Sequence, residues 1–245
     1  MNSFYQQLKK RSKKRLALLV DPDSYDSNRL EELIRHINLH PPDLLLVGGS
    51  ILFKPIEITI TALKLGTHLP VFIFPGNAIQ LSERADGILF LSMISGRNPE
   101  FLIGNHVLAA PHLSRSGIEV IPTGYMLIEN GHSTSVEYMS NTRPIPAHKT
   151  DIAVATAMAG EMLGLRSLYI EAGSGAAHSV DPGMISAIRK HVSLPMMVGG
   201  GIRSARTALD LYHAGADMIV VGNALEKDPG LIKAFCSTRD SLNSA

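Results

Sequence analysis

Two apolar runs near the end of the chain stop at glycine-containing turns, "VGGGIRS" and "VGN". The first turn comprises residues 199–201, the second 221–223, and a helix is predicted between them over 204–213. Glycine lets the backbone approach an anion closely, and the first N–H groups of a helix point toward such an anion. The glycines of a single such turn could serve only to make the turn tight. Two of them, one βαβ unit apart, predict a phosphate-binding site.

A third run ends in "YIEAGSGA", residues 169–176. Residues 173–175 supply further N–H and hydroxyl donors. Because side chains alternate along a strand, Tyr169 and Glu171 share one face. If that face is the interior of a barrel, both reach a ligand. Capping of the next helix or pairing with a surface arginine is the alternative role for Glu171.

Carboxylates and a hydroxyl follow the first two runs of the chain. Asp21 and Asp23 lie in "LVDPDS" and Ser50 in "VGGSI". A carboxylate beside a hydroxyl suits Mg²⁺, which takes one or two protein oxygens together with water and phosphate oxygens. Asp23 and Ser24 could equally form a turn, which Pro22 favours.

Other chemistries lack their residues. A Schiff-base aldolase needs a lysine at a strand end, whereas Lys54 and Lys149 fall in loops or helix starts. The fifth run ends in "PTGYM", which contains no carboxylate or histidine for sugar-phosphate isomerisation. The ten histidines show no metal-binding spacing such as HExxH.

The elements that must position these residues alternate in type. Helical stretches follow most of the apolar runs, which is typical of βαβ units around a parallel sheet. The pattern predicts an α/β fold, a (β/α)8 TIM barrel forming a single domain over 1–245. The eight candidate strands are 16–20, 43–49, 71–76, 87–92, 119–127, 167–173, 195–201 and 218–223; the helices are 28–39, 55–65, 98–109, 150–163, 182–190, 204–213 and 229–237.

Two connections depart from this alternation. Residues 77–86 are too few for a full barrel helix, so the helix between strands three and four is reduced or missing and the wall has a slot there. The connection 128–149 is long for a compact domain. It is either a lid over the strand ends or a helix-containing insertion with a packing role.

Composition limits the partners and the compartment. Lys and Arg total 23 against 22 Asp and Glu, so no nucleic-acid partner is expected. The lone Cys236 excludes an internal disulfide and suits a reducing compartment. No apolar run resembles a secretory signal or a membrane span, so a cytoplasmic location is expected. The basic cluster 9–15 could attract anionic lipid in a transient contact with a membrane surface; a solvated first helix is the favoured interpretation.

Taken in order, "VDPDS", "VGGS", "YIEAGSGA", "VGGGIRS" and "IVVGNAL" resemble the geranylgeranylglyceryl phosphate synthase family of prenyltransferase barrels over essentially the whole chain. "YMSNTRPIP" looks like the longer form of that family from archaea and bacteria. The resemblance implies Mg²⁺-dependent transfer of a polyprenyl group, by family default geranylgeranyl, from its diphosphate to the 3-hydroxyl of sn-glycerol 1-phosphate. The products are an ether lipid precursor and diphosphate.

The resemblance also implies residue roles. Asp21 and Ser50 would hold Mg²⁺, and Glu171, with Tyr169, would orient or deprotonate the attacking hydroxyl. Some relatives carry a lysine where this chain has Leu19, and Arg203 is a candidate substitute. The slot, flanked by Val71, Phe72, Phe74 and Ile79, is the candidate channel for the prenyl chain, and a mobile loop at this place is the alternative. Glycerol phosphate would contact Tyr169, Ile170, Glu171, Ala172, Gly173, Ser174, Gly175, Gly200, Gly201, Gly222 and Asn223.

The expected partners are therefore sn-glycerol 1-phosphate, a polyprenyl diphosphate and further copies of the chain, with a hexamer among the assemblies the resemblance suggests. The apolar helices over 150–163 and 229–237 could be buried in a core or in such an interface. Two alternatives stay open. One is a phosphate-binding barrel lyase or isomerase of small-molecule biosynthesis, and the other is a catalytically silent barrel that binds phosphometabolites.

Overall fold

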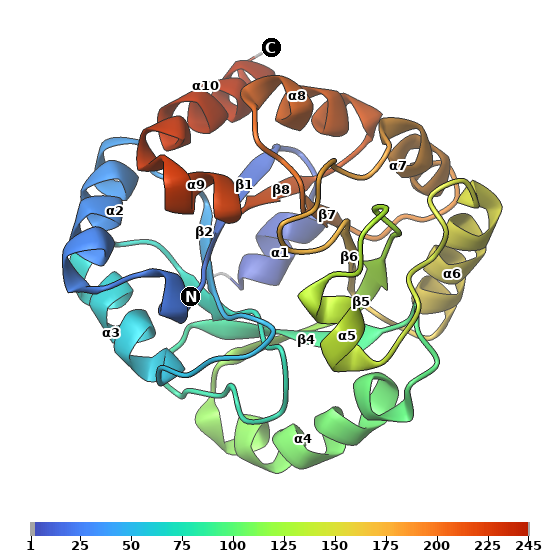
Figure 1. Cartoon of the computed structure of the whole chain (residues 1–245), viewed down its shortest axis with the longest axis horizontal. Coiled ribbons are helices and arrows are strands. Elements are labelled where there is room, and N and C mark those ends of the chain that lie inside the picture. The colour runs from blue at the N-terminus through green and yellow to red at the C-terminus, as the bar shows by residue number, and fades with distance from the viewer. Residues whose placement is uncertain (1–2, 245) are drawn as a thin grey trace.

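The computed structural model describes residues 3–244 and shows a closed parallel barrel of eight strands in sequential order. The predicted TIM-barrel fold is confirmed. Figure 1 looks along the barrel, with the helices arranged in a ring around the strands. The strands are β1 (Arg15–Val20), β2 (Leu44–Val47), β3 (Val71–Ile73), β4 (Gly87–Met93), β5 (Glu119–Leu127), β6 (Ser167–Glu171), β7 (Met196–Gly199) and β8 (Met218–Val221).

The helices lie close to their predicted positions, with differences in two places. The helix expected over 98–109 begins as a π-helical turn, η2, and continues to Ser116, and the one expected over 229–237 is preceded by a 3-10 turn and runs to Asn243. The helical elements are α1 (Phe4–Lys9), η1 (Pro22–Ser24), α2 (Ser27–Leu39), α3 (Ile56–Gly66), η2 (Glu100–Gly104), α4 (Asn105–Ser116), α5 (Ser135–Ser140), α6 (Thr150–Met162), α7 (Pro182–Arg189), α8 (Ala205–Ala214), α9 (Asn223–Lys227), η3 (Pro229–Leu231) and α10 (Ile232–Asn243).

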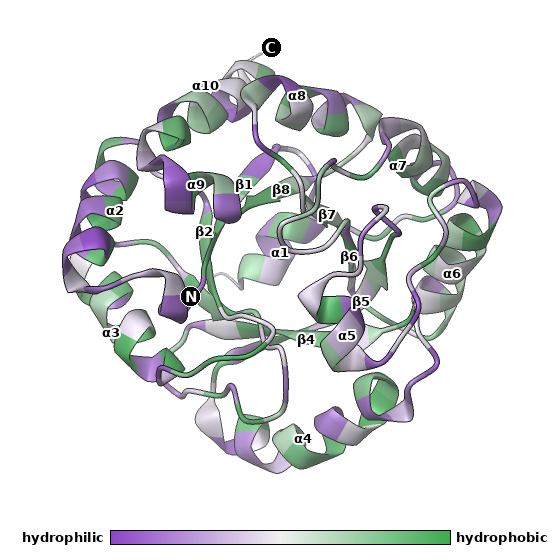
Figure 2. Cartoon of the chain, viewed as in Figure 1, coloured by the Kyte–Doolittle hydropathy of each residue, from purple (hydrophilic) through white to green (hydrophobic). Residues whose placement is uncertain are grey.

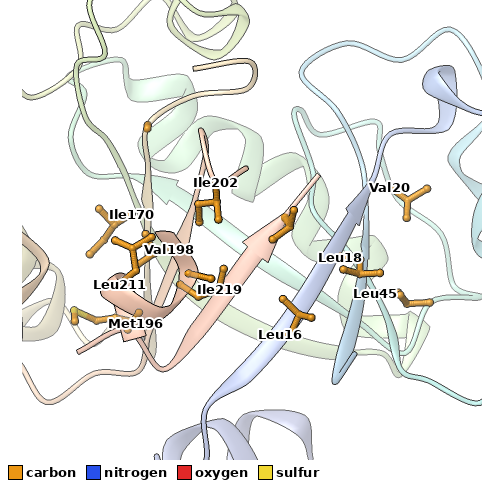
Figure 3. Packing of buried hydrophobic residues seen from close by; sticks show 14 of the residues in the cluster. Leu16, Leu18, Val20, Leu45, Ile170, Met196, Val198, Ile202, Leu211 and Ile219 are labelled. Atoms are coloured by element: carbon orange, nitrogen blue, oxygen red, sulfur yellow. The ribbon is translucent and has the colours of Figure 1, made fainter. Parts of the chain in front are cut away.

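Two apolar layers hold the barrel together, because each strand buries both of its faces. One layer lies between strands and helices, where Ile170 and Val198 meet Leu211 of α8 (Figure 3). The other fills the barrel interior and includes Leu46, Tyr169 and other residues of the opposite parity. Figure 2 accordingly shows the strands mostly green, while purple concentrates on the outer sides of the helices and on the loops.

The first helix closes the barrel interior, which corrects the favoured interpretation of a solvated helix. Phe4 and Leu8 of α1 are buried, and the Phe4 ring lies 5.4 Å from that of Phe72. The Phe4 N–H donates to Glu119, the first residue of β5, at 2.8 Å. In Figure 1 α1 lies at the centre of the ring of strands. One end of the barrel is thus plugged by the chain itself.

Three of the six basic residues in the cluster 9–15 make contacts at that same plugged end. Arg11 pairs with Asp217 at 3.3 Å, and Arg15 pairs with Asp43 at 3.6 Å. Lys14 donates to the carbonyl of Ala216 at 2.7 Å. Lys9, Lys10 and Lys13 of the cluster are exposed, and the transient membrane contact stays a prediction.

Both irregular connections are as unusual as predicted. Residues 74–86, all of which the structure describes, form no helix, so the slot between β3 and β4 is confirmed. The connection after β5 contains α5 and closes on itself through a bridge between Ile128 and Ile145. Within residues 3–244, no helix is both long and apolar enough to cross a bilayer.

Candidate active site

One cavity of about 570 Å³ opens at the carboxyl ends of the strands. Its polar half is lined by the tips of β1, β2, β6, β7 and β8, and its apolar half extends into the slot beside β4 and α4. Glu171 and Tyr169 lie among the lining residues and are also part of the barrel interior. The cavity therefore joins a polar region at the strand ends to an apolar channel.

Glu171 is the last residue of β6 and is only 5% exposed. Its carboxylate accepts a hydrogen bond from the Gly173 N–H at 3.0 Å and another from the Tyr169 hydroxyl. No lysine or arginine within residues 3–244 forms an ion pair with it. Burial raises the pKa of Glu171 to about 7, even though both hydrogen bonds act in the opposite direction. Such a carboxyl can take up and release a proton near neutral pH.

Aromatic rings surround this carboxylate. Tyr169 stacks on Tyr125 with centroids 5.6 Å apart and an interplanar angle of 3°, and Phe74 lies 4.8 Å from Tyr169. The prediction that Tyr169 and Glu171 share the interior face is confirmed. The Tyr125 hydroxyl is buried and has no hydrogen-bond partner among the described residues, and burial raises the pKa of Tyr125 well above its ordinary value. The sequence reasoning missed Tyr125, although its interior parity on β5 could have identified it.

The glycine-containing loops lie side by side as predicted. Asn223 Oδ1 accepts from the Ser174 hydroxyl at 3.2 Å and from the Gly175 N–H at 3.1 Å, which joins the tips of β8 and β6. Gly200 and Gly201 have φ values of +79° and +66°, and a side chain at Gly200 would lie 2.4 Å from Glu171. Only glycine allows this approach.

Not every residue predicted to contact glycerol phosphate faces the cavity with its side chain. Ile170 and Ala172 point into the layer between strands and helices, so only their backbone atoms could contribute. Those that line the cavity are Tyr169, Glu171, Ser174, Gly175, Gly200, Gly201, Gly222 and Asn223. Gly173 is not among the lining residues, and its N–H donates to Glu171.

Asp21 and Ser50 both line the polar half of the cavity. Asp21 caps η1 by accepting from the Asp23 N–H at 2.9 Å, and its second oxygen faces Gly49, where an added Cβ would lie 2.7 Å away. Asp23 accepts the N–H of Phe53 at 2.8 Å. It thereby holds the loop that carries Ser50. Asp23 also lies within the 3-10 turn η1, so the turn-forming interpretation of Asp23 is correct.

The donor set at Asp21 and Ser50 fits Mg²⁺. Burial raises the pKa of Asp21, and no lysine or arginine within residues 3–244 pairs with it. A half-buried carboxylate without a partner is stabilised by a cation. No cluster of three or more acidic, histidine or cysteine side chains in the described chain could hold a metal on its own. The remaining ligands must come from water or from an anionic substrate, which is how Mg²⁺ usually binds.

Arg203 is not a free replacement for the missing lysine. It lines the cavity, but its guanidinium donates to the carbonyls of Ala176 at 2.7 Å and Ala177 at 3.0 Å. Leu19 lines the cavity as an apolar residue.

The apolar half of the cavity lies in the predicted slot. Of the four residues expected to flank it, Phe74 lines the cavity, Val71 and Phe72 are buried elsewhere, and Ile79 is 88% exposed. The walls are formed mainly by Leu81, Ile88, Phe90, Phe101 and Ala109, and by Val136 and Met139 of α5. The insertion therefore contains a helix and also covers the cavity, which combines the two predicted alternatives.

Comparisons with known proteins agree with this geometry. The PcrB family model matches residues 8–239. The geranylgeranylglyceryl phosphate synthase of Spirosoma linguale is 46% identical over 95% of this chain and 94% of its own length. That of Thermococcus gammatolerans is 40% identical over 93% and 90%. The crystal structure of (S)-3-O-geranylgeranylglyceryl phosphate synthase from Thermoplasma acidophilum with its substrate sn-glycerol-1-phosphate superposes with a TM-score of 0.92, 29% identity and full coverage of both chains.

Proposed function

The chain belongs to the PcrB family, and from its site we propose that it acts as a geranylgeranylglyceryl phosphate synthase. This prenyltransferase joins the 3-hydroxyl of sn-glycerol 1-phosphate to the allylic carbon of a polyprenyl diphosphate, which carries a geranylgeranyl group. One observation carries the proposal. A single cavity has an anion-binding half and an apolar half, and Glu171 lies among the residues that line it.

The polar half binds glycerol phosphate. The phosphate contacts Ser174 and Gly175, the loop of residues 200–201 and the tip of β8 at Gly222 and Asn223, and this leaves the glycerol hydroxyl near Glu171. Backbone amides suit a phosphate monoester because their N–H groups donate hydrogen bonds to its negatively charged oxygens. A lyase or isomerase acting on a phosphorylated sugar would use the same anion site but would leave the apolar half without a role.

Glu171 accepts the proton of the attacking hydroxyl. The hydroxyl oxygen forms the ether bond to the allylic carbon, the bond from that carbon to the diphosphate oxygen breaks, and diphosphate leaves with the electron pair. Tyr169 orients Glu171 through its hydrogen bond. The rings of Tyr169, Tyr125 and Phe74 face positive charge that develops on the allylic carbon, which aromatic faces stabilise.

Asp21 and Ser50 hold Mg²⁺ in this proposal. When bound, Mg²⁺ neutralises the negative charge that develops on the leaving diphosphate. Asp21 remains ionised next to the cation despite its burial, and Asp23 keeps the loop of Ser50 in place.

The prenyl chain occupies the slot between β3 and β4 and the space beneath α4. Each buried CH₂ group contributes about 0.8 kcal/mol. One polar pair interrupts this channel: Nε2 of His106 lies 3.0 Å from the Ser92 hydroxyl, and the ring packs edge-on against Phe90. Burial lowers the pKa of His106, which keeps the ring neutral and compatible with a hydrocarbon.

Filling the channel should shorten the accepted prenyl chain. We expect Ala109→Phe to reduce kcat/KM for a 20-carbon diphosphate relative to a 10-carbon one by on the order of tenfold, because the ring takes the space of several methylene groups. Ala109 is buried at the cavity wall, whereas Ala110 is exposed on the same helix. Ala110→Phe is therefore the matched control. An unchanged ratio in Ala109→Phe would place the prenyl chain elsewhere.

Exposed apolar residues support assembly into a homo-oligomer. Val107 and Leu108 of α4 are 62% and 71% exposed, and Met162 and Leu163 at the end of α6 are 79% and 78% exposed. Exposed apolar patches commonly mark protein interfaces. The predicted helix over 150–163 thus contributes to such a surface, whereas α10 packs on α8 and β1. The hexamer and the cytoplasmic location stay predictions.

The proposal is tested by incubation with radiolabelled sn-glycerol 1-phosphate and prenyl diphosphates of several lengths, with and without a chelator. We expect label in the organic phase only when a prenyl diphosphate and free Mg²⁺ are both present. Exchange of protons on a sugar phosphate without lipid or metal would instead indicate a lyase or isomerase. Binding of glycerol phosphate with no chemistry would indicate a silent barrel.

A further inference from the structure

We propose that Asn130 and Arg203 are positioning residues that hold the phosphate-binding loop after β6 in its binding conformation from two sides. The inference rests on the proposed function and adds two residues to it. Both act on the backbone of residues 176–178, which directly follow the cavity-lining residues Ser174 and Gly175.

Asn130 contacts this segment from the insertion after β5. Its side-chain Nδ2 donates to the His178 carbonyl at 2.6 Å, and its Oδ1 accepts the N–H groups of Ala177 at 3.0 Å and His178 at 3.3 Å. One amide side chain thus satisfies three backbone groups of a loop 48 residues away in sequence. Because the Asn130 side chain uses both its NH₂ group and its oxygen, its amide must be held in one orientation.

Arg203 contacts the same segment from the loop after β7. Its guanidinium donates to the carbonyls of Ala176 and Ala177. Next to it, Gly201 approaches the segment so closely that an added Cβ would lie 2.2 Å from the His178 carbonyl oxygen. The loops after β6 and β7 are therefore linked to each other, which sets the spacing between two groups of phosphate-binding amides.

The insertion that carries Asn130 is itself fixed to the catalytic strand. The Ile128 N–H donates to the Glu171 carbonyl at 2.8 Å, and the Glu129 N–H donates to Ile145 at 2.8 Å. Asn130 therefore extends from a segment that is hydrogen-bonded to the end of β6. Beyond covering the prenyl channel with α5, the insertion thus keeps the phosphate loop in register with Glu171.

Loss of either contact should weaken glycerol phosphate binding more than it slows chemistry. A loop that is disordered before binding must be ordered by the ligand, and this cost reduces affinity. We expect Asn130→Ala and Arg203→Ala each to raise the KM and the Kd for glycerol phosphate by about tenfold, with kcat changed by less than about threefold. The KM for prenyl diphosphate should stay unchanged. The affinity of the double variant for glycerol phosphate should fall by less than the product of the two single fold-changes, because both residues hold the same segment.

The design separates positioning from direct charge recognition. Arg203→Lys keeps the positive charge but replaces the planar guanidinium by a single ammonium group. It should therefore resemble Arg203→Ala. Asn130→Asp keeps the oxygen that accepts the N–H groups of Ala177 and His178 and loses only the donation to the His178 carbonyl, so it should raise the Kd for glycerol phosphate less than Asn130→Ala does. Arg206→Ala and Asn38→Ala are matched controls, because Arg206 pairs with Asp210 and Asn38 donates to Gly66 on the outside of the barrel.

The measurement combines calorimetric titration with glycerol phosphate and amide hydrogen exchange in the free protein. We expect faster exchange at Gly175, Ala177 and His178 in the Asn130 and Arg203 variants, with unchanged melting temperatures. Arg203→Lys with wild-type affinity, or variants whose kcat falls while Kd is unchanged, would overturn the proposal. Wild-type protein that binds glycerol phosphate but transfers no prenyl group would refute the proposed function and leave this test intact.

Discussion

Replacement of Glu171 by Gln should lower kcat for prenyl transfer by about 10²- to 10⁴-fold, the usual contribution of a positioned general base. Glutamine keeps the shape of the side chain and an oxygen that accepts the Gly173 N–H. It cannot take the proton from the glycerol hydroxyl. Affinity for glycerol phosphate should therefore stay close to that of the wild type.

The pH dependence follows from the pKa of Glu171. Because burial raises this pKa from 4.5 to about 7, the ionised base becomes the major form only above about pH 7. We expect kcat/KM of the wild type to rise with pH through about 7, and we expect this rise to be absent in Glu171→Gln. The measurement is kcat/KM as a function of pH for the wild type and for Glu171→Gln. Glu31→Gln, on the exposed side of α2, is the control.

The same pKa predicts an effect on stability with a defined sign. The folded protein favours the protonated carboxyl of Glu171. The contribution of this carboxyl to the free energy of unfolding is therefore fully present below about pH 4.5 and is lost as the pH rises to about 7. The melting temperature of Glu171→Gln relative to the wild type should therefore increase between these pH values. A constant difference would mean that Glu171 titrates normally and is no buried base.

Replacement of Asp21 by Asn should lower the Mg²⁺-dependent rate by on the order of a hundredfold, similar to the loss of one group that stabilises transition-state charge. Asparagine retains an oxygen that accepts the Asp23 N–H, so η1 should keep its cap. The Mg²⁺ concentration for half-maximal activity should rise. Binding of glycerol phosphate should be largely unchanged, because its proposed site is lined by the tips of β6, β7 and β8.

The control for this variant is Asp26→Asn. Asp26 caps α2 by accepting the Arg29 N–H, and asparagine caps helices equally well. It should leave the rate and the Mg²⁺ requirement unchanged. If Asp21→Asn weakened glycerol phosphate binding as much as it slowed turnover, Asp21 would be a structural residue.

Much of this site could be predicted because it depends on local patterns. Strand alternation was sufficient to place Tyr169 and Glu171 on one face, and parallel strands bring their carboxyl ends to the same edge, which gathers the glycines and Asp21. The missing helix between β3 and β4 followed from the small number of residues available.

The remainder depends on contacts between segments far apart in the sequence. Asn130 contacts His178, and Phe4 packs against Phe72 inside the barrel. Local periodicity carries no information about such pairs, so the plug formed by α1 and the role of Asn130 were missed. Arg203 was recognised as a cation near the site, but its two carbonyl partners became known only from the loop geometry.

The central claim is that one cavity holds two anions, a phosphate monoester at the tips of β6 to β8 and a diphosphate near Asp21 and Ser50. A crystal structure with sn-glycerol 1-phosphate, Mg²⁺ and a non-hydrolysable prenyl diphosphate analogue tests it most directly. We predict the monoester against residues 173–175 and 200–201, the metal on Asp21, and the prenyl chain beneath α4. A diphosphate bound at the glycine loops, or a prenyl chain outside the slot, would contradict the account.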